Sequence, residues 1–143
     1  MESNQGNLDI FDLLSERHSR VHKTIENRWN EQSDIQLSNS EWLILDRLYQ
    51  QREQTIADVC RNVDITRQAT HKLIKKLEDR DLVVTSQMKN NKRSKLVSLT
   101  NLGVDSYENK KALKIKLEKQ IKDEIGEMEL TQLKVFLASD WGL

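Results

Sequence analysis

The sequence predicts a mainly α-helical fold with one small β-hairpin, on three observations. Proline is absent and glycine occurs only four times, so little in the chain interrupts helices. Charged residues make up 32% of the 143 residues and aromatic residues 5%, a balance that suits long helices better than a thick β-sandwich. Strand-like runs occur together in one short stretch between residues 83 and 99. The length allows one domain of typical size, or one small domain with helical extensions.

Two helices are predicted in the N-terminal part of the chain. From residue 9 to about 32, apolar residues recur at helical spacing and form one stripe, and Asp9 is a suitable N-cap. A second helix is expected over residues 38–51, where Ser38 and Glu41 have the spacing of a capping box. The first helix is long and has a single apolar stripe, so it needs another surface to pack against.

The middle of the chain contains a shorter pair of helices followed by the hairpin. The helices are expected over residues 56–62 and 67–80, with Thr66 as the N-cap of the second. Val83–Met88 and Lys95–Leu99 form the arms of the hairpin. This order of parts fits a winged helix-turn-helix, in which one helix enters a DNA groove and a basic wing touches the flanking backbone.

Two further helices are predicted at the C-terminal end. Thr100 caps a helix that runs to about residue 124, Gly126 interrupts it, and a last helix covers residues 127–138. The terminal helices carry more apolar surface than a small winged lobe can cover, so we expect a homodimer in which they interleave with those of the partner. A monomer whose terminal helices fold back together is the alternative. The expected domains are an N-terminal dimerisation helix (1–36), a winged lobe (37–100) and C-terminal dimerisation helices (101–143).

The net charge of zero hides a strong segregation of charge along the chain. Residues 61–100 contain ten basic and four acidic residues, a net charge of +6, so the remainder carries −6. A concentrated basic segment in a neutral protein is consistent with local contact to a polyanion. Because this segment coincides with the helix pair and the hairpin, we expect the polyanion to be double-stranded DNA.

The exposed face of the helix over residues 67–80 supplies the first set of candidate DNA contacts. Gln68 can present a bidentate amide to adenine, while Arg67 and His71 can donate to guanine edges or phosphates. The lysines farther along would neutralise phosphates, which gives affinity rather than sequence choice. The hydroxyl group at the helix start can also meet a phosphate. The expected contacts from this helix are Thr66, Arg67, Gln68, His71, Lys72 and Lys75.

The predicted hairpin supplies the second set of candidate DNA contacts. Its turn and the residues beside it carry four cations and no acid, which would repel one another without a polyanion. Arg93 is the candidate for the deep contact, because its planar guanidinium suits minor-groove edges and phosphates. The flanking cations are Lys89, Lys92 and Lys95.

Other functions find less support in the sequence. A winged-helix module whose basic face binds an acidic protein is the main alternative, and it would not distinguish an operator from a random duplex. An enzyme is not expected, because the chain has no Gly-rich phosphate loop, nucleophile elbow or set of metal ligands. No cofactor is expected either. The N-terminus does not resemble a secretory signal and no apolar run is long enough to span a membrane, so we expect a cytoplasmic protein.

Three residues are candidates for metal or redox chemistry. Cys60 is the single cysteine and lies beside apolar Val59, so a structural thiol is favoured over a redox sensor. His18 and His22 are four residues apart and can share a helix face, as metal ligands do. No third and fourth ligands accompany them, which favours an exposed or interfacial pair.

Several sequence pieces have the motifs of one known family. Residues 37–103 resemble the multiple-antibiotic-resistance regulator (MarR) family of bacterial transcription factors through Leu37-Ser38, Thr55-Ile56-Ala57-Asp58-Val59, Ile65-Thr66-Arg67-Gln68, Lys92-Arg93-Ser94 and Leu96-Val97-Ser98-Leu99-Thr100. The flanking helices match in position as well.

The resemblance implies a specific function and specific contacts. It implies a dimer held by the terminal helices, which binds palindromic promoter DNA and, as is often so in the family, is released by a small ligand. We therefore expect a transcriptional regulator that acts as a repressor. By position, Gln68, His71 and Lys72 would be groove contacts and Arg93 the wing-tip arginine. Asn91 stands where the family has aspartate, so an ion pair that steadies the wing arginine is missing. Asp81 replaces the glycine that ends the recognition helix, a position that requires a left-handed backbone.

Overall fold

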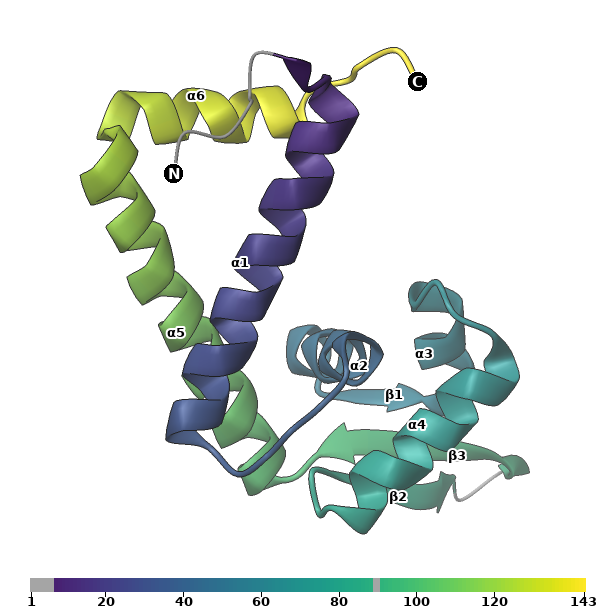
Figure 1. Ribbon diagram of the computed structural model, residues 1–143. Helices are drawn as coiled ribbons and strands as arrows, with labels where there is room; N and C mark the ends of the chain where they lie inside the picture. The colour runs from purple at the N-terminus through teal and green to yellow at the C-terminus, as the bar shows by residue number, and fades with distance from the viewer. Residues whose placement is uncertain (1–6, 89–90) are drawn as a thin grey trace. The chain divides into compact units, whose positions relative to one another are not determined.

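The computed structural model describes residues 7–88 and 91–143, without the side chains of residues 91–94. The chain divides into two compact units, which we call the winged unit (Asp34–Lys110) and the terminal unit (Met1–Ser33 and Lys111–Leu143). Figure 1 shows the elements of both.

The winged unit contains three complete helices, a small sheet and the start of a fourth helix. Its sheet has the order β1-β3-β2, with antiparallel neighbours. The elements are α2 (Asn39–Gln50), β1 (Glu53–Thr55), α3 (Ile56–Asn62), α4 (Arg67–Asp79), β2 (Val83–Met88), β3 (Asn91–Leu99) and the first residues of α5 (Asn101–Ile125). The predicted helix bounds are met to within one or two residues.

Side-chain caps explain where the helices of this unit begin. The hydroxyl of Ser38 accepts from the backbone N–H of Glu41 at 3.2 Å, and the Glu41 carboxylate accepts from the N–H of Ser38 at 3.2 Å. Thr55 and Asp58 form a second capping box at the start of α3, with distances of 3.1 and 3.4 Å. Because each box satisfies two backbone donors that would otherwise lack partners, the helix starts are fixed locally.

Strand β1 is an element that sequence patterns did not predict. It has only three residues and pairs with β3 through Gln54 and Val97. The buried Gln54 side chain donates from Nε2 to the carbonyls of Arg47 at 2.8 Å and Gln51 at 3.0 Å. It thereby caps the C-terminal end of α2, and a run this short leaves no visible alternation in the sequence.

The core of the winged unit lies between its helices and its sheet. Each element turns one apolar side inward, and fully burying such a side chain stabilises the fold by about 1.5–3 kcal/mol. The buried residues are Ile44, Leu45, Leu48, Val59, Val63, Ile74, Leu77, Leu82, Val83 and Val97.

The terminal unit is built from α1 (Ile10–Gln32), the larger part of α5 and α6 (Glu127–Ala138). Asp9 caps α1 as predicted, its carboxylate accepting from the N–H of Asp12 at 2.8 Å. Gly126, with φ of 109°, separates α5 from α6, also as predicted. In Figure 1, α6 runs from the end of α5 toward the start of α1.

The terminal unit has little core of its own. Among its described residues, the buried apolar ones are Trp29 and Leu113, and no residue of α6 is buried. Met128 is 71% exposed, Phe136 63% and Val135 60%. A 12-residue helix is marginal without a packed apolar face, so these side chains require a further surface to cover them.

None of the helices in the described ranges is long and apolar enough to cross a membrane.

Candidate nucleic-acid interface

Helix α4 is held at its start by Thr66, as the sequence predicts. The Thr66 hydroxyl accepts from the backbone N–H of Ala69 at 3.1 Å. The Thr66 carbonyl accepts from the hydroxyl of Thr70 at 3.0 Å, so Thr70 is buried without an unsatisfied polar atom. These bonds fix the first turn of α4, which carries Arg67 and Gln68.

The two faces of α4 separate as helical periodicity predicts. Thr70, Ile74 and Leu77 are buried against the winged unit. The candidate DNA contacts Thr66, Arg67, Gln68, His71, Lys72 and Lys75 are all exposed. Their side chains therefore lie on the solvent side of α4 and are free of the packing that holds the helix.

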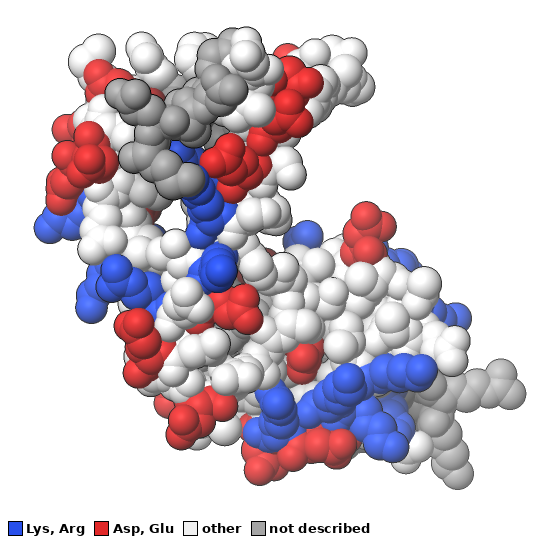
Figure 2. Space-filling model, viewed as in Figure 1, with Lys and Arg blue, Asp and Glu red and all other residues white. Residues whose placement is uncertain are grey.

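The charge on the exposed face of α4 is predominantly positive. The helix carries four basic residues, against two acidic residues in its last turn. Figure 2 shows blue side chains gathered along α4, with a smaller acidic group beside them. Such a face attracts phosphates, while the amide of Gln68 offers the geometry for reading a base.

The hairpin of β2 and β3 is longer and less regular than expected. Strand β3 begins at Asn91, four residues before the predicted start. The register pairs Gln87 with Lys95 and then Met88 with Asn91, so three residues of β3 lie in an irregularity of the ladder. A bulge of this kind is set by pairing across the hairpin, which local alternation in the sequence does not reveal.

The structure describes the wing residues to different extents. Lys95 lies in β3 with an exposed side chain. Lys92 and Arg93 belong to the same strand, but their side chains lie outside the description. Lys89 lies outside the described residues altogether. The role given to Arg93 therefore stays a prediction.

The end of α4 is joined to the start of α5 by a compact junction. Asp81 has φ of 59°, the left-handed backbone expected at this position. Its carbonyl accepts from the Thr100 hydroxyl at 2.5 Å, and the same hydroxyl accepts from the N–H of Gly103 at 3.0 Å, which confirms the Thr100 cap. A Cβ on Gly103 would lie 2.1 Å from the Leu82 carbonyl, so glycine allows the close approach.

Residues 37–103 match a family model described as "Winged helix DNA-binding domain". The matched range includes α4, the hairpin and the junction to α5. No related sequence was found among curated proteins.

Similar solved structures extend over most of the chain. A mutant of S. aureus MepR has a TM-score of 0.76 at 21% identity, covering 91% of this chain and 94% of its own. A mutant of E. coli MarR has a TM-score of 0.72 at 17% identity, with the same coverage. This chain has the winged-helix fold of the MarR family.

Two other structures show relatives of the MarR fold with ligands. A second MepR mutant, bound to an oligodeoxyribonucleotide, has a TM-score of 0.65 at 24% identity over 91% of this chain and 94% of that one. The organohalide-sensing regulator RdhR, bound to 2,4-dichlorophenol, has a TM-score of 0.70 at 19% identity over 96% of this chain and 82% of its own.

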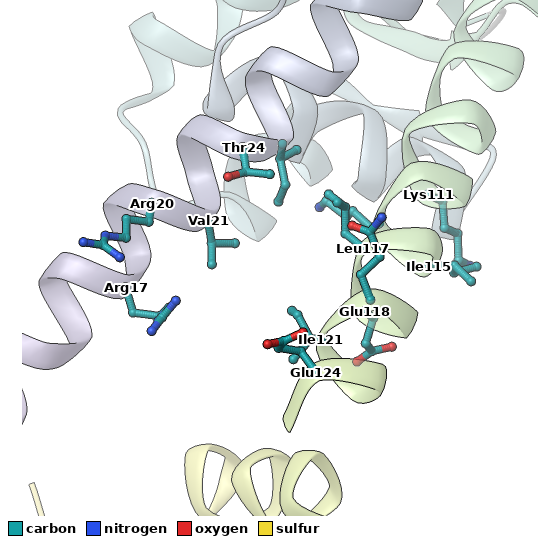
Figure 3. Close-up of a pocket in the computed structure, with 13 residues that line it drawn as sticks. Arg17, Arg20, Val21, Thr24, Lys111, Ile115, Leu117, Glu118, Ile121 and Glu124 are labelled. Atoms are coloured by element: carbon teal, nitrogen blue, oxygen red, sulfur yellow. The ribbon is translucent and has the colours of Figure 1, made fainter. Parts of the chain in front are cut away.

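The terminal unit of this MarR fold contains an open groove between α1 and α5, shown in Figure 3. Its volume is about 630 Å³. The lining has an apolar part that includes Val21, Ile25 and Ile121, and a polar part with more basic than acidic residues. The charged lining residues are Arg17, Arg20, Lys111, Lys114, Glu118 and Glu124. A groove of this size and lining can hold an amphipathic molecule.

Two tyrosines, one on α2 and one on α5, hold the start of α5 against α2. The hydroxyl of Tyr107 donates to Asp46, and the hydroxyl of Tyr49 donates to Glu108 at 2.9 Å. Burial and then the bond to Asp46 raise the pKa of Tyr107 to about 12. The hydrogen bond to Glu108 raises the pKa of Tyr49 above its ordinary value. These contacts belong to the scaffold of the MarR fold rather than to the face of α4.

The candidates for metal and redox chemistry belong to α1 and α3, not to α4. The His18 and His22 rings stack with centroids 6.1 Å apart, and His22 lies 3.9 Å from Glu26. Within the described part of the chain, no group of three or more His, Cys, Asp or Glu residues could hold a metal ion. Cys60 is half-buried in α3.

Proposed function

We propose that the protein is a sequence-specific DNA-binding transcriptional regulator that acts as a homodimeric repressor on palindromic promoter DNA. The observation that carries the proposal is the exposed face of α4, where an amide, a histidine and several cations lie together on a winged-helix domain. The DNA-bound MepR relative supports the same use of the fold. A dimer bound to promoter DNA would block the site that a polymerase needs. Because its target is DNA, we propose that the protein acts in the cytoplasm.

Each candidate residue has a role in this proposal. Gln68 reads a base in the major groove, with Arg67 and His71 as donors to base edges or phosphates. The remaining contacts of α4 and the wing bind phosphates, the lysines by neutralising their charge and the hydroxyl by a hydrogen bond, and Arg93 enters the minor groove. Those remaining contacts are Thr66, Lys72, Lys75, Lys89, Lys92 and Lys95.

The dimer interface is proposed to come from residues 1–36 and 101–143, a range that includes the whole terminal unit. Its exposed apolar side chains, above all those of α6, need a cover that the unit itself does not provide. A second copy is the economical cover, because two-fold dimers are the commonest oligomers. The two α4 helices would then meet successive major grooves, about 34–36 Å apart.

A small ligand is proposed to release the DNA because it lowers the population of the dimer conformation that can bind DNA. The dichlorophenol-bound RdhR relative supports this part of the proposal. We place the effector in the groove between α1 and α5, where an apolar lining and several cations favour an amphipathic organic anion. We therefore expect 2,4-dichlorophenolate to weaken DNA binding, and Ile121→Glu, which places an acid in the groove, to abolish that response.

The decisive experiment compares two duplexes across a range of salt. The first carries the DNA upstream of the protein's own gene and the second is a shuffled duplex of equal length. We expect tight binding to the first alone, with affinity falling steeply from low to moderate salt and weakened by Arg93→Ala. Equal binding to both duplexes and tolerance of Gln68→Ala would instead favour a module that binds an acidic protein.

A further inference from the structure

A polar contact joins α4 to the first strand of the wing. Glu78 lies in the last turn of α4, and its Oε2 accepts from the backbone N–H of Thr85 at 3.2 Å and from the Thr85 hydroxyl. Thr85 lies within β2, opposite Val97 of β3. Both Glu78 and Thr85 are half-buried. The carboxylate therefore faces the sheet rather than open solvent.

An acidic side chain at this position of α4 disfavours DNA binding, so a compensating contribution is needed to offset it. Glu78 belongs to the helix that carries the cations, and its charge opposes the approach of phosphates. Hydrogen bonds to a carboxylate are roughly twice as strong as those between neutral groups, and partial burial protects them from water. The bonds to Thr85 can therefore offset the electrostatic cost of the acid.

The contact also restrains the wing in a way that apolar packing does not. Ile74 and Leu77 pack α4 onto the sheet, but hydrophobic contact has no preferred direction. Hydrogen bonds fix a direction and a distance. Because β2 pairs with β3 from Val83 to Met88, a restraint at Thr85 also places Lys95, the partner of Gln87 two residues away.

We propose that Glu78 is a positioning residue, which sets the wing relative to α4 so that both touch one duplex at the same time. The inference rests on the proposed DNA-binding function. Glu78 itself is not expected to touch DNA. Without its carboxylate, α4 would still bind, but the wing would touch fewer phosphates of the DNA backbone.

The test compares Glu78→Ala with Asp79→Ala. Asp79 is the exposed neighbour of Glu78, so the two variants make the same change of charge at adjacent positions of the same helix. Charge alone predicts that both variants bind DNA as tightly as the wild type or more tightly. We expect this of Asp79→Ala, whereas Glu78→Ala should bind DNA roughly ten-fold more weakly. The salt slope, by which we mean the steepness with which the logarithm of the binding constant falls with the logarithm of the salt concentration, should also be smaller in Glu78→Ala. It should decrease by about one for each phosphate that the wing no longer neutralises.

Two further variants separate positioning from a loss of stability. Glu78→Gln should keep the wild-type slope, because its carbonyl oxygen can accept the same bonds. Thr85→Val removes the hydroxyl donor without a change of charge, and its slope should fall by less than that of Glu78→Ala. Partial unfolding lowers the concentration of active protein but leaves the salt slope unchanged, so the slope reports positioning. If Glu78→Ala does not fold, Thr85→Val carries the same test.

The outcomes distinguish the two levels of the proposal. A wild-type protein that does not bind DNA contradicts the proposed function itself. A wild-type protein that binds DNA, together with a Glu78→Ala variant that keeps the wild-type slope, overturns the positioning role alone. A Glu78→Gln variant that behaves like Glu78→Ala also contradicts the hydrogen-bond account.

Discussion

Gln68 and Lys75 lie on the same exposed face of α4 but are expected to contribute differently. Gln68→Ala should cost about 1–3 kcal/mol of binding free energy on the preferred duplex and little on an unrelated one, because an amide pair distinguishes bases. Lys75→Ala should weaken both complexes equally and lower the salt slope by about one, because it removes a phosphate contact. Anisotropy titrations with both duplexes measure the difference. Equal effects of Gln68→Ala on the two duplexes would contradict base reading.

Tyr107 gives the stability of the protein a predictable dependence on alkaline pH. Its pKa is raised from 10.0 to about 12, so the folded protein holds the phenolic proton more tightly than the unfolded chain does. This contribution is complete below pH 10 and is lost as the pH rises through 12. Tyr107→Phe should be less stable by about 1 kcal/mol at pH 8 because it lacks the bond to Asp46.

The difference between the wild type and Tyr107→Phe should then shrink above pH 10. Urea unfolding of both proteins at pH 8 and pH 11 measures this. A constant difference over that range would contradict the assigned titration.

At the scale of elements, the junction of α4, β2 and α5 depends on Gly103. A methyl group there would lie 2.1 Å from the Leu82 carbonyl, which is backbone and cannot rotate away. Gly103→Ala should therefore destabilise the winged unit by about 1–3 kcal/mol, as overpacking does. Thermal or urea unfolding checks this. Asp105→Ala, at an exposed position of the same helix, is the control and should change stability by less than about 0.5 kcal/mol.

At the scale of the whole molecule, the exposed apolar side chains of α6 predict self-association. Phe136 is 63% exposed. If a second copy covers it, Phe136→Glu places a charge in the interface and should weaken the dimer by roughly a hundred-fold, or about 2.7 kcal/mol. Val84→Glu changes a side chain of β2 that is 51% exposed, and should leave the dimer intact.

Sedimentation equilibrium on the wild type and both variants measures the association. A wild-type protein that is monomeric at micromolar concentration would contradict the proposed interface.

The sequence alone determined where the helices of this protein begin and end, because local interactions set these positions. The Ser38 and Thr66 caps and the break at Gly126 act within a few residues, so their positions could be predicted without any tertiary contact. The same holds for the exposed face of α4, because helical periodicity alone separates it from Thr70, Ile74 and Leu77.

The tertiary structure decided the features that depend on residues far apart in the chain. Gln54 becomes buried in β1 because it pairs with β3, and β3 begins at Asn91 because of its register with β2. The bond between Glu78 and Thr85 likewise needs a helix and a strand brought together by a shared core. Periodicity and capping carry no information on such contacts, since the chain must first fold for the partners to meet.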